Sequence, residues 1–187
     1  MKNVAIFASG SGSNAQAIVE YFRKQGKEPV KLILTNNPKA YVLERTRRLG
    51  IESVIFSYDD LYHSTKVLEI LRERQIDFIV LAGFLWLIPP YLLEAYRGRI
   101  VNIHPALLPK YGGKGMYGMK VHQAVVANRE KETGITIHWV DEEYDHGDII
   151  LQVTCPVSPT DSPEQVAAKV HELEHYYYPM EIEKLIR

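Results

Sequence analysis

Residues 4–14 read VAIFASGSGSN, a short apolar run that passes directly into a loop of alternating serine and glycine. An uninterrupted apolar run of this length is typical of a buried strand. The glycines allow the backbone to turn tightly into the segment that follows. That segment carries a helical stripe and ends at Gly26, where a glycine favours helix termination. The stripe consists of Ala15, Ile18, Val19 and Phe22.

The same succession of strand and helix continues through the first hundred residues. Further helices are predicted at about 40–49, ending at Gly50, and at about 64–75. Several of the strands lack polar alternation, as expected of a parallel sheet that is covered on both faces. We therefore predict an α/β fold with a doubly wound, mostly parallel sheet. Its strands are predicted at Val4–Ala8, Val30–Leu34, Ser53–Phe56, Phe78–Ala82 and Ile100–Ile103.

The last third of the chain has a different pattern. Apolar and other residues alternate from Gly134 to Val140, and a second β-rich run spans Ile149–Val157, which predicts an antiparallel hairpin at the sheet edge. Ser162, followed by proline and by Gln165 three positions on, is a capping-box signature. It predicts a terminal helix from about 163 to 177.

Composition narrows the class of protein. A chain of 187 residues with 46% hydrophobic and 24% charged residues fits one globular domain over 1–187. With a net charge of −1, the protein has no excess of positive charge to attract nucleic acid or an anionic membrane, so neither is expected as a partner. The longest apolar stretch, 78–88, is about half of the roughly 20 residues that a membrane span needs. The single cysteine, Cys155, and the absence of a recognisable targeting segment favour a cytoplasmic location.

The glycine-serine loop at 9–14 is a candidate phosphate site, because glycines permit close approach and a helix start presents unpaired N–H groups. It also matches a loose dinucleotide fingerprint, which requires an acidic residue near the end of the second strand. That strand ends in Thr35-Asn36-Asn37, so a single phosphate is favoured over a dinucleotide. A Walker lysine is lacking as well. The alternative is a tight turn in which Ser13 or Asn14 only caps the helix.

A second chemical signal is Asn102-Ile103-His104-Pro105, at the end of an apolar strand. Side chains two apart project to the same face, so Asn102 and His104 point together while Ile103 turns into the core. Asp145, in the predicted hairpin loop, could orient the imidazole and raise its pKa. The alternatives are a buried structural histidine and a solvated acidic turn.

The remaining histidines of the second half are interpreted as structural. His171 and His175 stand in a His-x-x-x-His spacing, but no third ligand accompanies them in the pattern, and no metal is expected. The histidines interpreted as structural are His122, His138, His146, His171 and His175.

Together these motifs resemble the folate-dependent phosphoribosylglycinamide formyltransferase family. The resemblance runs through nearly the whole chain in matching order. The Asn-x-His-Pro-x-Leu-Leu-Pro segment is shared by formyltransferases more widely, whereas the glycine-serine-asparagine loop is specific to the purine enzyme. The resemblance rests on residues 9–14, 80–84, 102–111 and 145–150.

The resemblance implies a formyltransferase fold in which residues 1–100 bind phosphate and residues 101–187 carry catalysis and folate binding. It further implies transfer of a formyl group from 10-formyltetrahydrofolate to glycinamide ribonucleotide, by a monomer or homodimer. The implied catalytic residues are Asn102, His104 and Asp145. The implied substrate-binding residues are Gly12, Ser13, Asn14 and Glu174. The implied folate-binding residues are Leu85, Trp86, Leu87, Ile88, Asn102 and Asp141, the last through its backbone.

The mechanism expected from this set begins with attack of an amine on the formyl carbonyl. Asn102 and a protonated His104 would stabilise the developing oxyanion, and Asp145 would keep His104 charged at neutral pH. Two departures from the family stand out: the glycine-rich segment 112–118 is longer than in many relatives, and Trp86 replaces an arginine.

Three alternatives remain open at this point. A formyltetrahydrofolate hydrolase would use the same three residues with water as acceptor. A formyltransferase acting on initiator methionyl-tRNA would be expected to carry a basic RNA-binding domain. A non-catalytic nucleotide-binding module would use the glycine loop and leave the Asn, His and Asp residues without a role.

Overall fold

One mixed sheet of seven strands organises the computed structural model, which describes residues 1–187. Its strand order is β3-β2-β1-β4-β5-β6-β7, and the pairings from β3 to β5 are parallel. The last two pairings, β5 with β6 and β6 with β7, are antiparallel. The strands are β1 (Val4–Phe7), β2 (Val30–Thr35), β3 (Glu52–Ile55), β4 (Phe78–Leu81), β5 (Ile100–His104), β6 (Glu132–Trp139) and β7 (Ile149–Pro156).

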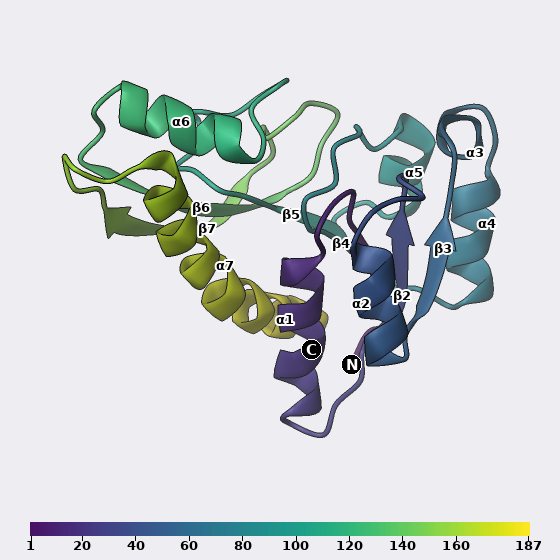
Figure 1. Cartoon of the computed structure of the whole chain (residues 1–187). Coiled ribbons are helices and arrows are strands. Elements are labelled where there is room, and N and C mark those ends of the chain that lie inside the picture. The colour runs from purple at the N-terminus through teal and green to yellow at the C-terminus, as the bar shows by residue number, and fades with distance from the viewer.

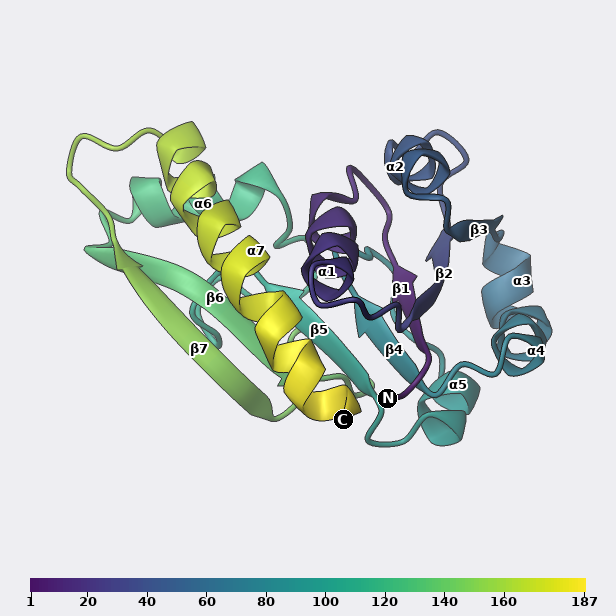
Figure 2. The ribbon, with the colours of Figure 1, turned by 90° about the horizontal axis from the view of Figure 1, so that it is seen from below.

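Seven helices cover the sheet on both faces (Figures 1 and 2). Viewed along the sheet in Figure 2, α1 and α2 lie on one side of the strands and α3, α4 and α5 on the other. The long helix α7 runs beside α1 and brings the C-terminus next to the N-terminus (Figure 1). The helices are α1 (Ser13–Arg23), α2 (Val42–Leu49), α3 (Tyr58–Tyr62), α4 (Lys66–Glu73), α5 (Pro90–Ala95), α6 (Met119–Ala127) and α7 (Pro163–Ile186).

Alternation along the central strands divides the core into two layers. In β1, Val4 and Ile6 pack beneath α1 and α7, whereas Ala5 and Phe7 pack beneath α3, α4 and α5. All four side chains are fully buried. Burial on both faces explains why these strands read as continuous apolar runs, and it confirms the predicted doubly wound sheet with its antiparallel edge hairpin.

The terminal helix is longer than the sequence predicted. The capping box at Ser162 forms as expected, but α7 continues past residue 177 to Ile186, with Pro179 inside it. A proline removes one helical hydrogen bond and usually breaks or kinks a helix. Here the following turns are held by tertiary packing, because Tyr178 and Ile182 are fully buried against the sheet.

Short helices were the elements that sequence patterns left undefined. The predicted helix at about 64–75 is α4, but α3 and α5 were not predicted, since each is too short to establish an apolar period. No bounds were predicted for α6, the helix that contains His122. The helix predicted from residue 40 begins at Val42.

The strand order creates a crevice between β1 and β4. The chain leaves β1 towards α1 on one face and leaves β4 towards α5 on the other, so the loops diverge where these neighbouring strands end. In doubly wound sheets, ligands bind at such a switch point. The backbone N–H of Ser9 donates to the carbonyl of Gly83 at 3.0 Å, which ties the two loops together at the base of the crevice.

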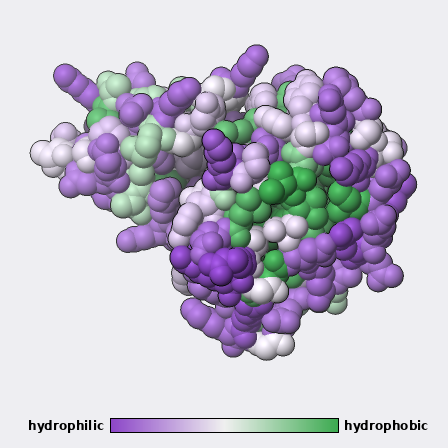
Figure 3. Space-filling model, turned by 45° about the vertical axis from the view of Figure 1, so that its right-hand side comes forward, coloured by the Kyte–Doolittle hydropathy of each residue, from purple (hydrophilic) through white to green (hydrophobic).

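The surface is uneven in polarity (Figure 3). Hydrophobic side chains gather near the middle of the broader part of the molecule and are surrounded by hydrophilic ones. The narrower projection is mostly hydrophilic, with hydrophobic side chains among the polar ones. No helix is both long enough and apolar enough to cross a membrane.

The hydroxyl of Tyr178 offers a test of how α7 is fastened to the sheet. It is buried and donates towards the carbonyls of Leu81 at 2.8 Å and Val101 at 3.3 Å, at neighbouring strands. Tyr178→Phe leaves these carbonyls short of a partner, so we expect the free energy of unfolding to fall by about 1–2 kcal/mol. Urea denaturation with an unchanged m-value measures this loss. Wild-type stability in Tyr178→Phe would contradict the assigned bond.

Candidate active site

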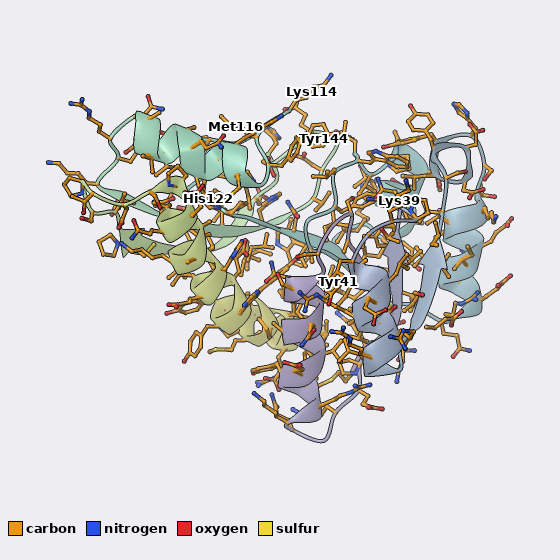
Figure 4. All side chains as sticks on the ribbon, in the orientation of Figure 1. Lys39, Tyr41, Lys114, Met116, His122 and Tyr144 are labelled. Atoms are coloured by element: carbon orange, nitrogen blue, oxygen red, sulfur yellow. The ribbon has the colours of Figure 1, made fainter.

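A cavity of about 670 Å³ opens at the carboxyl ends of β1, β4 and β5. Its walls come from the loop after β1, the loop after β4, the end of β5, the segment 113–119 and the face of α7. This volume is within the range of pockets that enclose a small ligand. Figure 4 shows Lys114, Met116 and Tyr144 around its upper rim and His122 between α6 and α7. The cavity therefore brings together both chemical signals of the sequence.

The loop at 9–14 forms one end of the cavity. Gly12 has a left-handed conformation, φ 74°, and a Cβ there would lie 2.3 Å from Cγ2 of Val42. Only glycine fits this position, since both the backbone angle and the close approach exclude a side chain. Gly12 is the N-cap of α1 and makes no side-chain capping bond. The alternative in which Ser13 or Asn14 caps the helix is therefore not the arrangement found, and the helix start remains able to accept an anion.

The catalytic set predicted from the sequence comes together in the same cavity. Nδ1 of His104 lies 3.4 Å from Oδ2 of Asp145, and Nδ2 of Asn102 lies 3.5 Å from Oδ1 of the same carboxylate. Nε2 of His104 donates to the carbonyl of Tyr111 at 2.6 Å. This bond assigns the ring proton to Nε2 and leaves Nδ1 facing the carboxylate.

Asp145 reaches this position through a tightly constrained loop between β6 and β7. Its own φ is 52°, and Oδ2 accepts a bond from the backbone N–H of Gly113 at 3.1 Å. Gly147 packs so closely that a Cβ would lie 1.7 Å from the carbonyl of Trp139. The glycine two residues after the acid is thus required for the loop to fold back over the strand end.

His138 belongs to this cluster although the sequence interpretation placed it among structural histidines. It pairs with Asn102 across β5 and β6, and its Nε2 accepts a bond from Nδ2 of Asn102 at 3.1 Å. Its Nδ1 donates to the carbonyl of Trp139 at 2.9 Å. The strand alternation already placed His138 on the polar face of β6. The missing information was the register that sets it opposite Asn102.

Burial governs the charge of His104. The ring is almost fully buried, and this desolvation lowers its pKa below the usual 6.5, although Asp145 and the carbonyl of Tyr111 act in the opposite direction. This direction opposes the expectation that Asp145 keeps His104 protonated at neutral pH. It favours a neutral imidazole in the ligand-free protein, whose Nδ1 can take up a proton.

Glu174 links α7 to the phosphate loop. Its carboxyl accepts a bond from Nδ2 of Asn14 at 3.1 Å, and burial raises its pKa to about 7. Oδ1 of Asn14 is buried without a hydrogen-bond partner. A group that carries hydroxyl donors, such as a ribose, would satisfy both oxygen atoms at this point.

The residues expected to contact folate are divided between the cavity wall and its surroundings. Leu85 and Asn102 line the cavity. Trp86 packs instead in an aromatic cluster with Phe56 and Tyr62, and Ile88 is buried in the core beneath α5. Leu87 and Asp141 also lie outside the cavity wall.

Two residues that were not predicted line this part of the cavity together with Leu85. They are Phe84 and Tyr144, and the hydroxyl of Tyr144 donates to the Leu85 carbonyl at 3.2 Å.

Two further histidines line the cavity without having been predicted as site residues. His122 is buried, its Nδ1 has no hydrogen-bond partner, and burial lowers its pKa to about 4. His171 lies one helical turn before Glu174 on the same face of α7. The sequence could not reveal either, because a histidine on an amphipathic helix reads the same whether it faces a core or a cavity.

The pKa of Glu174 predicts a specific pH dependence of stability. Because the folded pKa is raised from 4.5 to about 7, folding is favoured by protonation, and this contribution is lost as pH rises between these values. Relative to Glu174→Gln, the wild-type protein should lose about 3 kcal/mol of stability between pH 4.5 and pH 8. Urea titrations of both proteins across this range provide the measurement. Parallel pH profiles would show that the carboxyl is not desolvated.

Comparisons with known proteins agree with this geometry. The chain is 41% identical over 98% of its length to a chloroplastic phosphoribosylglycinamide formyltransferase of Vigna unguiculata, of which it spans 61%. It is 38% identical to the Bacillus subtilis phosphoribosylglycinamide formyltransferase, covering 95% of that protein. A crystal structure of the Streptococcus pneumoniae TIGR4 enzyme of the same name superposes with a TM-score of 0.88 at 38% identity, with both chains fully covered.

The family assignment follows from these matches together. A family model described as Formyl transferase matches residues 2–182, which is almost the whole chain. The solved structure shares the sheet, the edge hairpin and the terminal helix on which the cavity depends. The chain belongs to the formyl transferase family.

Proposed function

We propose that this chain transfers a formyl group from 10-formyltetrahydrofolate to the amino group of glycinamide ribonucleotide, a step of purine biosynthesis. One observation carries the proposal: a loop suited to a single phosphate and a buried imidazole–carboxylate pair line the same cavity. A substrate with a phosphate at one end and a nucleophile at the other would span it. The full-length bacterial relatives bear the name of this activity.

The acceptor substrate would lie along the floor of the cavity. Backbone N–H groups at Ser13 and Asn14, at the start of α1, would bind its phosphate. Glu174 would accept hydrogen bonds from ribose hydroxyls, and Asn14 would accept another through its unpartnered oxygen. The amine would then reach the neighbourhood of His104 at the end of β5.

The formyl donor would occupy the side of the cavity that the β4 loop and the hairpin loop form. Phe84, Leu85 and Tyr144 offer it an apolar wall, as expected for an extended aromatic cosubstrate. We propose that Asn102 both contacts the formyl donor and takes part in catalysis. The walls would be supported from behind by Trp86, Leu87, Ile88 and Asp141. Bound there, the donor supplies the activated formyl carbon.

His104 would carry the proton during the reaction. Attack by the amine releases a proton and places negative charge on the formyl oxygen, while the leaving nitrogen of the donor needs a proton. The neutral Nδ1 of His104 can accept the first proton and return it to the leaving nitrogen, so the step balances without an external acid. Asp145, 3.4 Å from Nδ1, stabilises the imidazolium in between.

Asn102 would stabilise the developing oxyanion with one of its two amide N–H groups, which would exchange its long 3.5 Å contact with Oδ1 of Asp145 for the formyl oxygen. Its amide nitrogen lies between Nε2 of His138 and Oδ1 of Asp145, which holds the side chain in one orientation. A donor that is fixed before the reaction loses little free energy to reorganisation, and this is why such groups contribute strongly to rate. His138 is a positioning residue in this scheme, because it acts through Asn102.

A direct formyl-transfer assay tests the proposal. Purified protein is given 10-formyltetrahydrofolate with glycinamide ribonucleotide, and both loss of donor and appearance of the formylated amine are followed by mass spectrometry. We expect one formylated product for each donor consumed and no consumption without the amine. Donor loss that is independent of the amine would instead identify a hydrolase that uses water as acceptor.

Removing the imidazole should abolish most of the turnover. His104→Ala deletes the group that carries the proton, and we expect kcat to fall on the order of a hundredfold or more. The matched control is His63→Ala, an exposed histidine at the end of α3 whose ring contacts Asp59. Turnover within a few-fold of wild type in His104→Ala would remove His104 from the mechanism.

A further inference from the structure

Arg45, on α2, binds the phosphate loop from outside the cavity. Its Nε donates to the carbonyl of Ser11 at 2.6 Å, and its Nη1 donates to Oε1 of Gln16 in α1 at 2.6 Å. The guanidinium carbon lies 5.1 Å from the ring centre of Tyr41, which supports its other side. One side chain therefore joins the loop, the first turns of α1 and the start of α2.

The start of α2 is itself fastened to the same loop. The backbone N–H of Val42 donates to the carbonyl of Gly10 at 3.0 Å, and the Val42 side chain packs against Gly12. Figure 4 shows Tyr41 at the beginning of α2, the helix that runs beside α1. The charge of Arg45 is thus fixed in position relative to the loop.

The charges around the cavity make this contact significant. Lys114 is the only lysine or arginine that lines the cavity, and it lies at the upper rim (Figure 4). Beside the loop stands Glu174, whose pKa of about 7 leaves it partly ionised at neutral pH. A dianionic phosphate at the loop would therefore meet a carboxyl group, and it needs a positive charge nearby. Arg45 is the cationic side chain bonded to the loop backbone.

We propose that Arg45 is a positioning residue of the phosphate subsite. It ties back the carbonyl of Ser11, whose oxygen would repel an anion if it turned inward, and it supplies the positive charge that Glu174 otherwise offsets. It acts through the loop, because its side chain is absent from the cavity wall. The inference rests on the proposed function only in requiring that the substrate carry a phosphate monoester.

Kinetics of Arg45→Met test this role. We expect KM for glycinamide ribonucleotide to rise about tenfold or more with kcat within about twofold of wild type, since a charge-assisted bond that holds the phosphate loop is lost. Glycinamide riboside, which lacks the phosphate, should show no comparable loss. The matched control is Arg48→Met, which removes the same charge one turn further along α2 from a side chain that pairs with Glu44.

Thermal shifts with sugar ligands provide a readout that does not depend on the formyl acceptor. Ribose 5-phosphate should stabilise the wild-type protein more than ribose does, and Arg45→Met should abolish this difference while Arg48→Met retains it. Arg45→Lys, which keeps the charge but not the two-pronged contact, should restore part of the difference. If Arg45→Met weakens the riboside and the ribonucleotide equally, or leaves the phosphate-dependent shift intact, the inference is overturned.

The two proposals fail separately. A wild-type protein that is stabilised by ribose 5-phosphate but does not formylate glycinamide ribonucleotide would contradict the proposed function and leave the role of Arg45 standing. Normal formylation together with a phosphate-dependent shift that is unchanged in Arg45→Met would support the proposed function and contradict the role of Arg45.

Discussion

The site depends on one nearly buried carboxylate, Asp145, at the point where the hairpin loop meets the end of β5. Its two oxygens face the Asn102 amide, the His104 imidazole and the backbone N–H of Gly113, while the imidazole of His138 lies 3.8 Å away. A charge with little access to water must be compensated by such partners. The strand end, the hairpin and the glycine-rich segment are thereby held in one arrangement.

In the proposed function, binding is separated from chemistry. The doubly wound half of the chain would provide the helix start that binds the substrate phosphate, at the switch point between β1 and β4. The antiparallel half adds Asp145 and His138 beside the end of β5, where Asn102 and His104 point into the same crevice. Burial lowers the pKa of His104 and so favours its neutral form at rest, and the neighbouring carboxylate is placed to stabilise the proton that the proposed reaction delivers.

Much of this could be predicted from local patterns. The five parallel strands, the edge hairpin and the start of α7 follow from apolar runs, alternation and a capping box, all of which are properties of neighbouring residues. The end of α7 could not be predicted, because burial of Tyr178 and Ile182 outweighs the effect of Pro179. Short helices such as α3 carry too few residues for a period.

The site residues also divide into those that local patterns predict and those that depend on tertiary packing. Asn102 and His104 were predictable as a pair from their spacing, whereas Asp145 was singled out among the acids of the hairpin loop only through the family resemblance. His138 became part of the set only through the strand register, and the pKa of His104 only through its burial. Arg45 gave no sequence signal, since an arginine on a polar helix resembles any solvated side chain until its contact with Ser11 is known.

The state of the His104 proton is the most direct test of this account. Titration of the ring by NMR in the ligand-free protein should give a pKa below 6.5, and a lower one still in Asp145→Asn, because burial lowers it and the carboxylate raises it. A pKa above 6.5 in the wild-type protein, or one that does not change in Asp145→Asn, would contradict a neutral imidazole that is coupled to Asp145.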